Sequence, residues 1–429
     1  MTEFNYLLNF MLNMKYINKI SLLFAVAILS SLTGCKKSSL SGNTSRGTGW
    51  QINAKDGGFQ YNTRYKGQET APGLVFVEGG TFTRGSVQDD VMHDWNNSPN
   101  QQHVASFYMD ETEVTNLMYL EYLDWIKRVY PPSDDKFKQI YASAVPDTLV
   151  WRNRLGNSEV YVENYLRHPA FMNYPVVGVS WIQAVQYAEW RSDRVAEIGL
   201  QKEGYLERDS QFSATAEENF SVDTYVNAPT KSFGGNDSIT LPAKRRAKAI
   251  GEDSINLYAR RESGAIPLKY RLPTESEWEY AARGGLDLSP YPWGGPYIRN
   301  TRGCFLANFK PLRGNYYDDG GIHTVPVVSY EPNDFGLYCM AGNVAEWTTT
   351  AFDESVYDFA HDLNMDYKYE AEDDDPPVLK RKVIRGGSWK DVGYFLQTSS
   401  RTYEYQDTAK SYIGFRNVMS YLGMGKSDI

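Results

Sequence analysis

The chain has 429 residues, of which 41% are hydrophobic and 14% aromatic, which is enough for a large folded core and excludes a chain that is disordered throughout. Its formal net charge of -9 provides no cationic surface of the kind that binds phosphate backbones, so nucleic acid is not an expected partner. Three cysteines cannot form a disulfide framework for a chain of this length. The hydrophobic core must therefore stabilise the fold.

The amino-terminal segment predicts export and lipid attachment. Residues 20–32 form an apolar run that follows two lysines and is too short to span a bilayer, which is the pattern of a signal peptide over residues 1–34. The four residues that end at Cys35 resemble the bacterial lipobox, whose cysteine is acylated and anchors the protein to a membrane. A plain signal peptide with an incidental cysteine is the alternative. In an oxidising compartment the other two cysteines, Cys304 and Cys339, could form one disulfide, although the sequence does not place them in contact.

A tether and then a folded body are predicted after Cys35. Residues 35–72 are expected to be flexible, because residues 38–49 are rich in Ser, Gly and Thr and offer little to bury. A single domain is expected over residues 73–429. Its first strand is predicted at residues 74–77, with a break at Gly79-Gly80 and a continuation directly after.

Three helix starts are indicated by capping residues. The first helix is predicted to begin after Thr115 and to end before Pro131-Pro132. Its expected apolar face carries one residue at every third position, namely Leu117, Leu120, Leu123 and Ile126. Two further helices are predicted to begin at Ser180 and Thr274, each with a Gln or Glu three residues later that completes a capping box.

Two polar segments interrupt the body. Residues from about 200 to 262 show no clear period and are predicted to be an inserted loop. Residues 370–375, with the sequence EAEDDD, are predicted to be a solvated face, and a partner-docking or cation-binding role is the alternative. Many Gly, Pro and aromatic residues around only three clear helices indicate an irregular α+β fold.

Eight blocks, in order along the chain, resemble the formylglycine-generating-enzyme (sulfatase-modifying factor) family. They are Leu74–Ser86, Phe107–Asn116, Tyr174–Trp181, Arg271–Gly285, Tyr291–Gly294, Asn333–Tyr338, Gly342–Trp347, and Arg385–Trp389 with Gly414–Arg416 after it. The resemblance implies that family's irregular α+β fold, which is related to C-type lectins. Packing alone would also favour these residues, and a fold does not by itself specify an activity.

The resemblance also implies that the chemistry of the family's enzymes is lost. Those enzymes bind copper through two cysteines shortly after the Arg-Gly-Gly-Ser block, whereas residues 389–400 here contain no cysteine. Because Cu(I) prefers thiolate ligands, we expect no copper, no catalytic residue and a pseudoenzyme. Other branches of the fold hold iron with histidines. The histidines here are widely spaced, although distant ones could converge: His93, His103, His168, His323 and His361.

Calcium is the ion that the resemblance favours, because two turns of the family hold it with oxygen ligands. The first turn maps to the side chains of Asn308 and Asp319 and the backbone of Phe309 and Gly321. The second, weaker candidate maps to Gly342, Val344 and Glu346, preceded by Cys339 in place of an oxygen ligand. Turns held by ordinary hydrogen bonds are the alternative.

Residues Val87–Asn116 further resemble the gliding-motility lipoproteins of Bacteroidota, especially the J type, whose K-type relatives form part of the periplasmic ring of the type IX secretion system. This resemblance implies a non-catalytic scaffold subunit whose partners are other proteins of the gliding-motility and secretion machinery. Lys36-Lys37 stand where such lipoproteins carry an acidic surface-export tag, which favours the periplasmic leaflet of the outer membrane. The alternatives are an enzyme with an unrecognised site in the cleft and a glycan-binding or peptidoglycan-binding module.

Overall fold

The computed structural model describes residues 44–54, 58–62, 65, 67–86, 97–153, 156–207, 214–236, 240–241, 258–316, 318, 321–359 and 366–423. The chain divides into two compact units, Met1–Tyr65 and Lys66–Ile429. The predicted signal peptide and Cys35 lie outside the described residues. Within the described ranges, no helix is long and apolar enough to cross a membrane.

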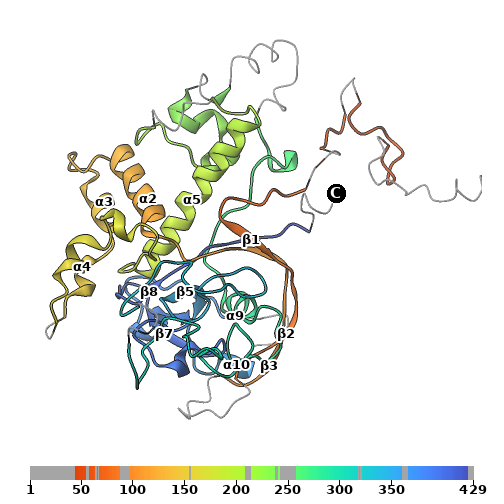
Figure 1. Ribbon diagram of the computed structural model, residues 1–429. Coiled ribbons are helices and arrows are strands. Elements are labelled where there is room, and N and C mark those ends of the chain that lie inside the picture. The colour runs from red at the N-terminus through yellow and green to blue at the C-terminus, as the bar shows by residue number, and fades with distance from the viewer. Residues whose placement is uncertain are drawn as a thin grey trace, which may run out of the picture. The chain divides into compact units, whose positions relative to one another are not determined.

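The described part of the larger unit contains three small sheets (Figure 1). The first has the order β1-β4-β9, with β1 at Leu74–Val77, β4 at Phe107–Asp110 and β9 at Val418–Ser420. The second pairs β2 (Gly80–Arg84) with β3 (Asn100–Val104). The third has the order β7-β6-β5-β8, with β5 at Ala345–Ala351, β6 at Arg381–Arg385, β7 at Thr402–Tyr405 and β8 at Ile413–Gly414. Because β4 pairs with both β1 and β9, the two ends of this unit meet in one sheet.

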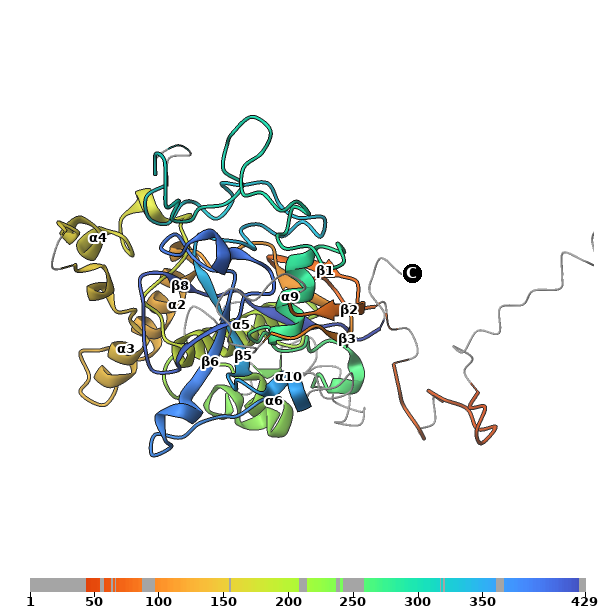
Figure 2. The same cartoon turned by 90° about the horizontal axis from the view of Figure 1, so that it is seen from below.

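Helices of unequal length surround these sheets. The described α-helices are α2 (Asn116–Val129), α3 (Lys138–Ala144), α4 (Glu159–Asn164), α5 (Trp181–Lys202), α6 (Val222–Asn227), α9 (Glu275–Arg283) and α10 (Val356–Phe359). The described 3-10 helices are η1 (Thr148–Trp151), η2 (Pro169–Phe171), η3 (Pro229–Gly235), η5 (Arg261–Ser263), η6 (Pro377–Lys380) and η7 (Gly393–Leu396). Figures 1 and 2 both show α2, α3 and α4 on one side of the strands. This mixture of helices and short strands confirms the predicted α+β class.

The predicted starts of the three helices are confirmed. Thr115 caps α2 by accepting a hydrogen bond from the backbone N–H of Met118. Ser180 and Thr274 both form complete capping boxes, at the starts of α5 and α9. The break between β1 and β2 also lies at Gly79, where an added Cβ would be 2.4 Å from backbone atoms of the neighbouring strand segment. The three caps depend on residues that are close in the sequence, which is why the sequence reveals them.

The predicted apolar face of α2 is wrong at its start. Leu117 is 55% exposed, and the buried apolar residues are instead Tyr119, Tyr122, Leu123, Ile126 and Val129. A helix has 3.6 residues per turn, so a stripe that recurs strictly every third residue drifts around the helix and leaves the core. The buried residues are instead related by steps of both three and four positions, as a core-facing helix requires.

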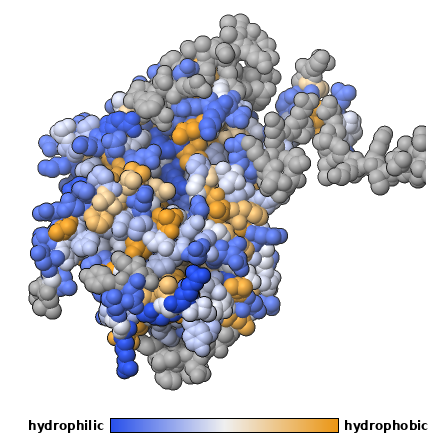
Figure 3. Space-filling view, in the orientation of Figure 1, coloured by the Kyte–Doolittle hydropathy of each residue, from blue (hydrophilic) through white to orange (hydrophobic). Residues whose placement is uncertain are grey.

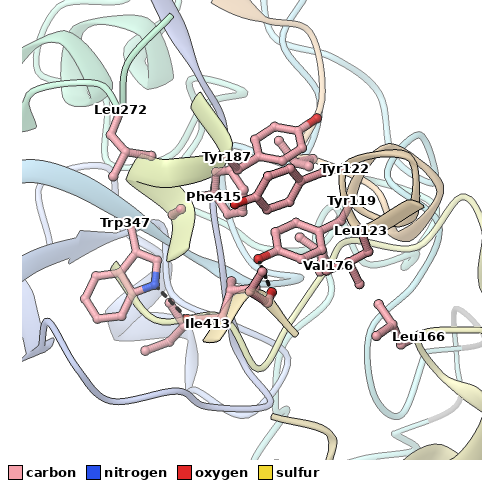
Figure 4. Packing of buried hydrophobic residues seen from close by; sticks show 14 of the residues in the cluster. Tyr119, Tyr122, Leu123, Leu166, Val176, Tyr187, Leu272, Trp347, Ile413 and Phe415 are labelled. Carbon is pink, nitrogen blue, oxygen red and sulfur yellow. Dashed lines mark hydrogen bonds between the residues drawn. The ribbon is translucent and has the colours of Figure 1, made fainter. Parts of the chain in front are cut away.

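The main core joins α2, α5 and the four-stranded sheet (Figure 4). The rings of Tyr119 and Tyr187 stack at 5.5 Å, and Phe415 packs edge-on against Tyr187 at 5.4 Å. Trp347 of β5 is fully buried, and its indole N–H donates to the carbonyl of Val179 at 3.1 Å. On the face drawn in Figure 3, by contrast, hydrophobic residues occur in small groups among hydrophilic ones. The core thus fixes β5, which carries Glu346, and the residues after β8, which include Arg416.

The stretch predicted as an inserted loop contains structure of its own. It includes α6 and η3, and its apolar side chains Leu206, Phe220, Tyr225 and Phe233 form a buried cluster with residues of α5. Residues 208–213, 237–239 and 242–257 of the stretch lie outside the description. The loop prediction is therefore wrong for part of it, because short helices and turns each contribute one or two core residues and leave no period to detect. The acidic segment 370–375 is mostly exposed, as predicted.

Candidate functional site

The first candidate calcium turn is built around Asn308. This residue is buried, and its amide N–H donates to the carbonyl of His323 at 2.6 Å. A Cβ on Gly321 would lie 3.0 Å from the Asn308 amide oxygen, so the two predicted ligands are neighbours. Phe309 follows Asn308 and is half-buried, whereas Asp319 lies outside the described residues. The structure brings Asn308 and Gly321 together, and calcium at this turn stays a prediction.

The second turn lies directly against the first. Gly342 has a φ of +76°, and a Cβ at this position would lie 2.3 Å from the carbonyl oxygen of Asn308. Any other residue would collide with the first turn, so glycine is required here. The carbonyl of Asn308 also accepts a hydrogen bond from the backbone N–H of Asn343 at 2.9 Å.

Asn343 connects the two turns to the core, and it was not among the residues predicted for the site. Its amide oxygen accepts from the backbone N–H of Val325, and its amide nitrogen donates to Glu113 Oε1, both at 2.9 Å. Its φ of +63° lies in the left-handed region, which asparagine tolerates better than most residues. An asparagine directly after the glycine of a predicted turn was the available signal.

Glu346, predicted as the carboxylate of the second calcium turn, is engaged by protein donors. It accepts from the indole N–H of Trp278 at 2.7 Å and from Nε and Nη2 of Arg416, the shortest of these contacts also being 2.7 Å. Glu346 and Arg416 are both fully buried. The backbone of Val344, another predicted ligand, lies in the same buried turn. A cation at the second turn would have to compete with Arg416 for this carboxylate.

Glu113 adds a second buried carboxyl group next to this ion pair. Burial, and then the neighbouring Glu346, raise the pKa of Glu113 well above the usual glutamate range, while Arg416 opposes the shift. The fold therefore favours the protonated form of Glu113. Glu113 was not predicted as a site residue, because a position just before a helix start gives no sign of what the tertiary structure packs around it.

The two described cysteines do not pair. Cys304 is exposed, whereas Cys339 is buried and its thiol donates to the carbonyl of Val327 at 3.4 Å. The disulfide that the sequence left open is therefore not formed. Burial, and then the nearby Glu113 and Glu346, raise the pKa of the Cys339 thiol, which disfavours the thiolate needed for nucleophilic attack or metal binding.

The three described histidines lie on separate parts of the fold. His103 lies on β3 near Thr81, His168 caps η2, and His323 packs against Tyr161. His93 and His361 lie outside the described residues. Across the described part of the chain, no three His, Cys, Asp or Glu side chains are grouped to hold a metal ion.

The segment after the Arg-Gly-Gly-Ser block presents one carboxyl group and an aromatic surface. Asp391 accepts a hydrogen bond from the Ser388 hydroxyl at 2.6 Å, and burial raises the pKa of this carboxyl. Leu396, at the end of η7, is fully buried. The ring of Trp389 lies 4.8 Å from that of His323 and stacks on Trp151 at 6.1 Å. The segment therefore offers a hydrogen-bonded carboxyl and aromatic rings, with no thiol.

A cavity of about 400 Å³ is formed partly by the residues that follow His323. Its lining consists of Tyr174, Phe305, Thr324, Val325, Pro326, Ser329 and Tyr330. This lining contains aromatic rings and hydroxyl groups and no charged side chain, so it suits a neutral ligand better than an ionic one.

Comparison with known proteins identifies the family. Residues 60–421 match the sulfatase-modifying factor enzyme 1-like domain. The chain belongs to this family. It is 25% identical to the formylglycine-generating enzyme of Mus musculus over 377 residues, and this aligned region covers 84% of this chain and 81% of that protein. It is 35% identical to the inactive C-alpha-formylglycine-generating enzyme 2 of Bos taurus over 152 residues, and this aligned region covers 34% of this chain and 42% of that protein.

Solved structures give a weaker likeness. The structure of PvdO from Pseudomonas aeruginosa matches with a TM-score of 0.49 and 20% identity, over 81% of this chain and 94% of that one. The sulfatase-modifying-factor family predicted from the eight sequence blocks is thus confirmed by the match to the family's domain. Within that family, this chain has its described thiols at Cys304 and Cys339 and none between residues 389 and 400.

Proposed function

We propose that the chain is a non-catalytic member of the sulfatase-modifying-factor family and serves as a scaffold subunit of the gliding-motility and type IX secretion machinery. The observation that carries the proposal is the segment after the Arg-Gly-Gly-Ser block, which has no cysteine and whose carboxyl group, on Asp391, is held by Ser388. Thiolates are the ligands that Cu(I) requires, so copper-dependent oxidation of a substrate cysteine has no site here. An inactive protein among the relatives agrees with loss of the activity in a retained fold.

The proposed location and partners depend on the amino-terminal sequence. Acylation of Cys35 would hold the protein at the periplasmic leaflet of the outer membrane. The resemblance of Val87–Asn116 to gliding-motility lipoproteins supports ring proteins of the motility and secretion machinery as partners. Calcium at the Asn308 turn would be a structural ion that stabilises the face next to Gly342.

Extraction of the tagged protein from its native outer membrane in mild detergent tests this proposal. Mass spectrometry should find secretion-ring and motility components in fixed proportion to the protein, and a Cys35→Ala variant should lose both the membrane fraction and these partners. Recovery of the protein alone, while the ring components are detected elsewhere in the same preparation, would contradict the scaffold role.

Copper titration tests the loss of catalysis separately. The purified protein should show no Cu(I) binding tighter than that of an exposed thiol, and a Cys304→Ser variant should remove what weak binding there is. Tight, stoichiometric Cu(I) binding that survives this substitution would overturn the non-catalytic assignment.

The uncharged cavity favours a second candidate function, the binding of a neutral ligand such as a glycan. Tyr174, Phe305 and Tyr330 would supply ring faces, and Thr324 and Ser329 hydroxyl groups. Ligand-detected NMR with neutral oligosaccharides would test it, with a Ser329→Trp variant that fills the cavity as the control. Signals that are unchanged in this variant would exclude the cavity as the site.

A further inference from the structure

We infer that residues 44–54 and 58–62 form a membrane-contacting element that lies on an anionic lipid surface through three exposed aromatic side chains. These are Trp50, Phe59 and Tyr61, which are 80%, 64% and 50% exposed. All three belong to the smaller unit, Met1–Tyr65. Large apolar rings exposed together on a short segment indicate a surface that is covered in the working protein.

Internal hydrogen bonds hold the rings in place. The backbone N–H of Ser45 donates to the carbonyl of Trp50 at 2.7 Å, which closes a turn that ends at the tryptophan. Asn53, with a φ of +59°, accepts from the backbone N–H of Tyr61 through its side-chain oxygen at 2.7 Å and donates from its amide to the Tyr61 carbonyl at 2.8 Å. The backbone N–H of Asn53 also donates to the carbonyl of Phe59 at 2.9 Å. These bonds hold residues 59 and 61 in place, and the rings of Phe59 and Tyr61 stack with their centroids 5.9 Å apart.

The charge of the segment identifies the surface. Residues 36–66 contain six basic residues and one acidic residue, in a chain whose net charge is -9. A basic segment is attracted to anionic lipid head groups, and Trp and Tyr prefer the boundary between head groups and acyl chains because their rings are amphipathic. Aromatic and basic residues on one short segment therefore suit a bilayer surface.

Membrane contact by these aromatic side chains would limit the range of motion of the anchored protein. A flexible tether over residues 35–72 that made no contacts would let the folded body move freely above a membrane. Contact through Trp50, Phe59 and Tyr61 would shorten the free part of the tether and add a second membrane signal to any acyl chain. This membrane contact does not depend on the proposed scaffold role, because it is tested with a chain that is not acylated. Either proposal can therefore fail without the other.

Vesicle sedimentation with residues 36–429 is the test, because this chain keeps the unit Lys66–Ile429 intact and lacks Cys35. We expect binding to vesicles of phosphatidylethanolamine and phosphatidylglycerol, weakened by salt and by replacement with phosphatidylcholine. The variant Trp50→Ala/Phe59→Ala/Tyr61→Ala should lower the partition coefficient about tenfold or more. The matched control, Tyr297→Ala/Leu312→Ala/Tyr316→Ala, removes exposed apolar side chains from the larger unit and should bind as the parent does.

Fluorescence quenching by brominated lipid provides a second readout that does not require loss of binding. Part of the tryptophan emission should be quenched on vesicles, and a Trp50→Phe variant should lose most of that quenching. Equal binding by the aromatic variant and the parent, or an equal loss in the control variant, would overturn the inference. Sedimentation with peptidoglycan in the absence of any vesicle binding would also overturn it.

Discussion

Replacement of Arg416 by methionine tests the buried ion pair that stands beside the two candidate calcium turns. The guanidinium group donates to both oxygens of Glu346, to the carbonyl of Asp110 at 3.1 Å and to that of Tyr338 at 2.8 Å. Arg416→Met removes these donors and leaves Glu346 with the single hydrogen bond from Trp278. Removing one partner of a fully buried pair costs about 3–5 kcal/mol, because the remaining charge is unpaired in a region of low dielectric.

Such a loss is a large fraction of the roughly 5–15 kcal/mol that stabilises a typical domain. Urea unfolding followed by tryptophan fluorescence should show a lower midpoint with an unchanged slope. A double variant, Arg416→Met/Glu346→Gln, should lose less than the sum of the two single variants, since neither charge then remains unpaired.

The exposed pair Arg152–Glu159, whose side chains are 57% and 51% exposed, provides the matched control. An Arg152→Met variant should leave the unfolding midpoint unchanged, because solvent screens an exposed pair. Our account of the buried pair is refuted if Arg416→Met unfolds at the same urea concentration as Arg152→Met, or if the losses in the double variant simply add.

Three further predictions follow from single side chains. Burial raises the pKa of Glu113, so the folded state holds this proton more tightly than the unfolded state; the resulting stability is present at acid pH and is lost as pH rises through the raised pKa. Glu113→Gln should flatten that fall in the free energy of unfolding, and a pH-independent difference from the parent would argue against it. Thr274→Ala should cost about 1 kcal/mol of stability, because it removes the side chain that caps α9, and Thr274→Ser should restore it; equal melting temperatures for all three would contradict the capping role. Calcium at a hundred times its dissociation constant should add about 2.7 kcal/mol to the stability of the parent and nothing to that of Asn308→Ala, and an equal response would exclude the first turn as the site.

The family blocks in the sequence located the candidate site without showing its contents. One block contains Gly342 and Glu346, and the calcium turns of the family also map to Asn308; the structure puts Gly342 within van der Waals distance of Asn308. They did not show that Glu346 is paired with Arg416, which follows 70 residues later, or that Asn343 donates to Glu113, 230 residues earlier. These partners lie in separate blocks, and nothing in either block specifies the distance between them in space.

The sequence by itself determined the features that depend on neighbouring residues. Ser180 and Thr274 start helices because each side chain accepts a hydrogen bond from a backbone N–H three residues later. The absence of thiols from residues 389–400 was likewise visible at once. Only the tertiary structure decided that Cys304 and Cys339 stay apart and that Glu113 is buried next to Glu346. Those outcomes depend on how distant segments pack, and the free energy of that packing is shared among many side chains and is not encoded in any short pattern.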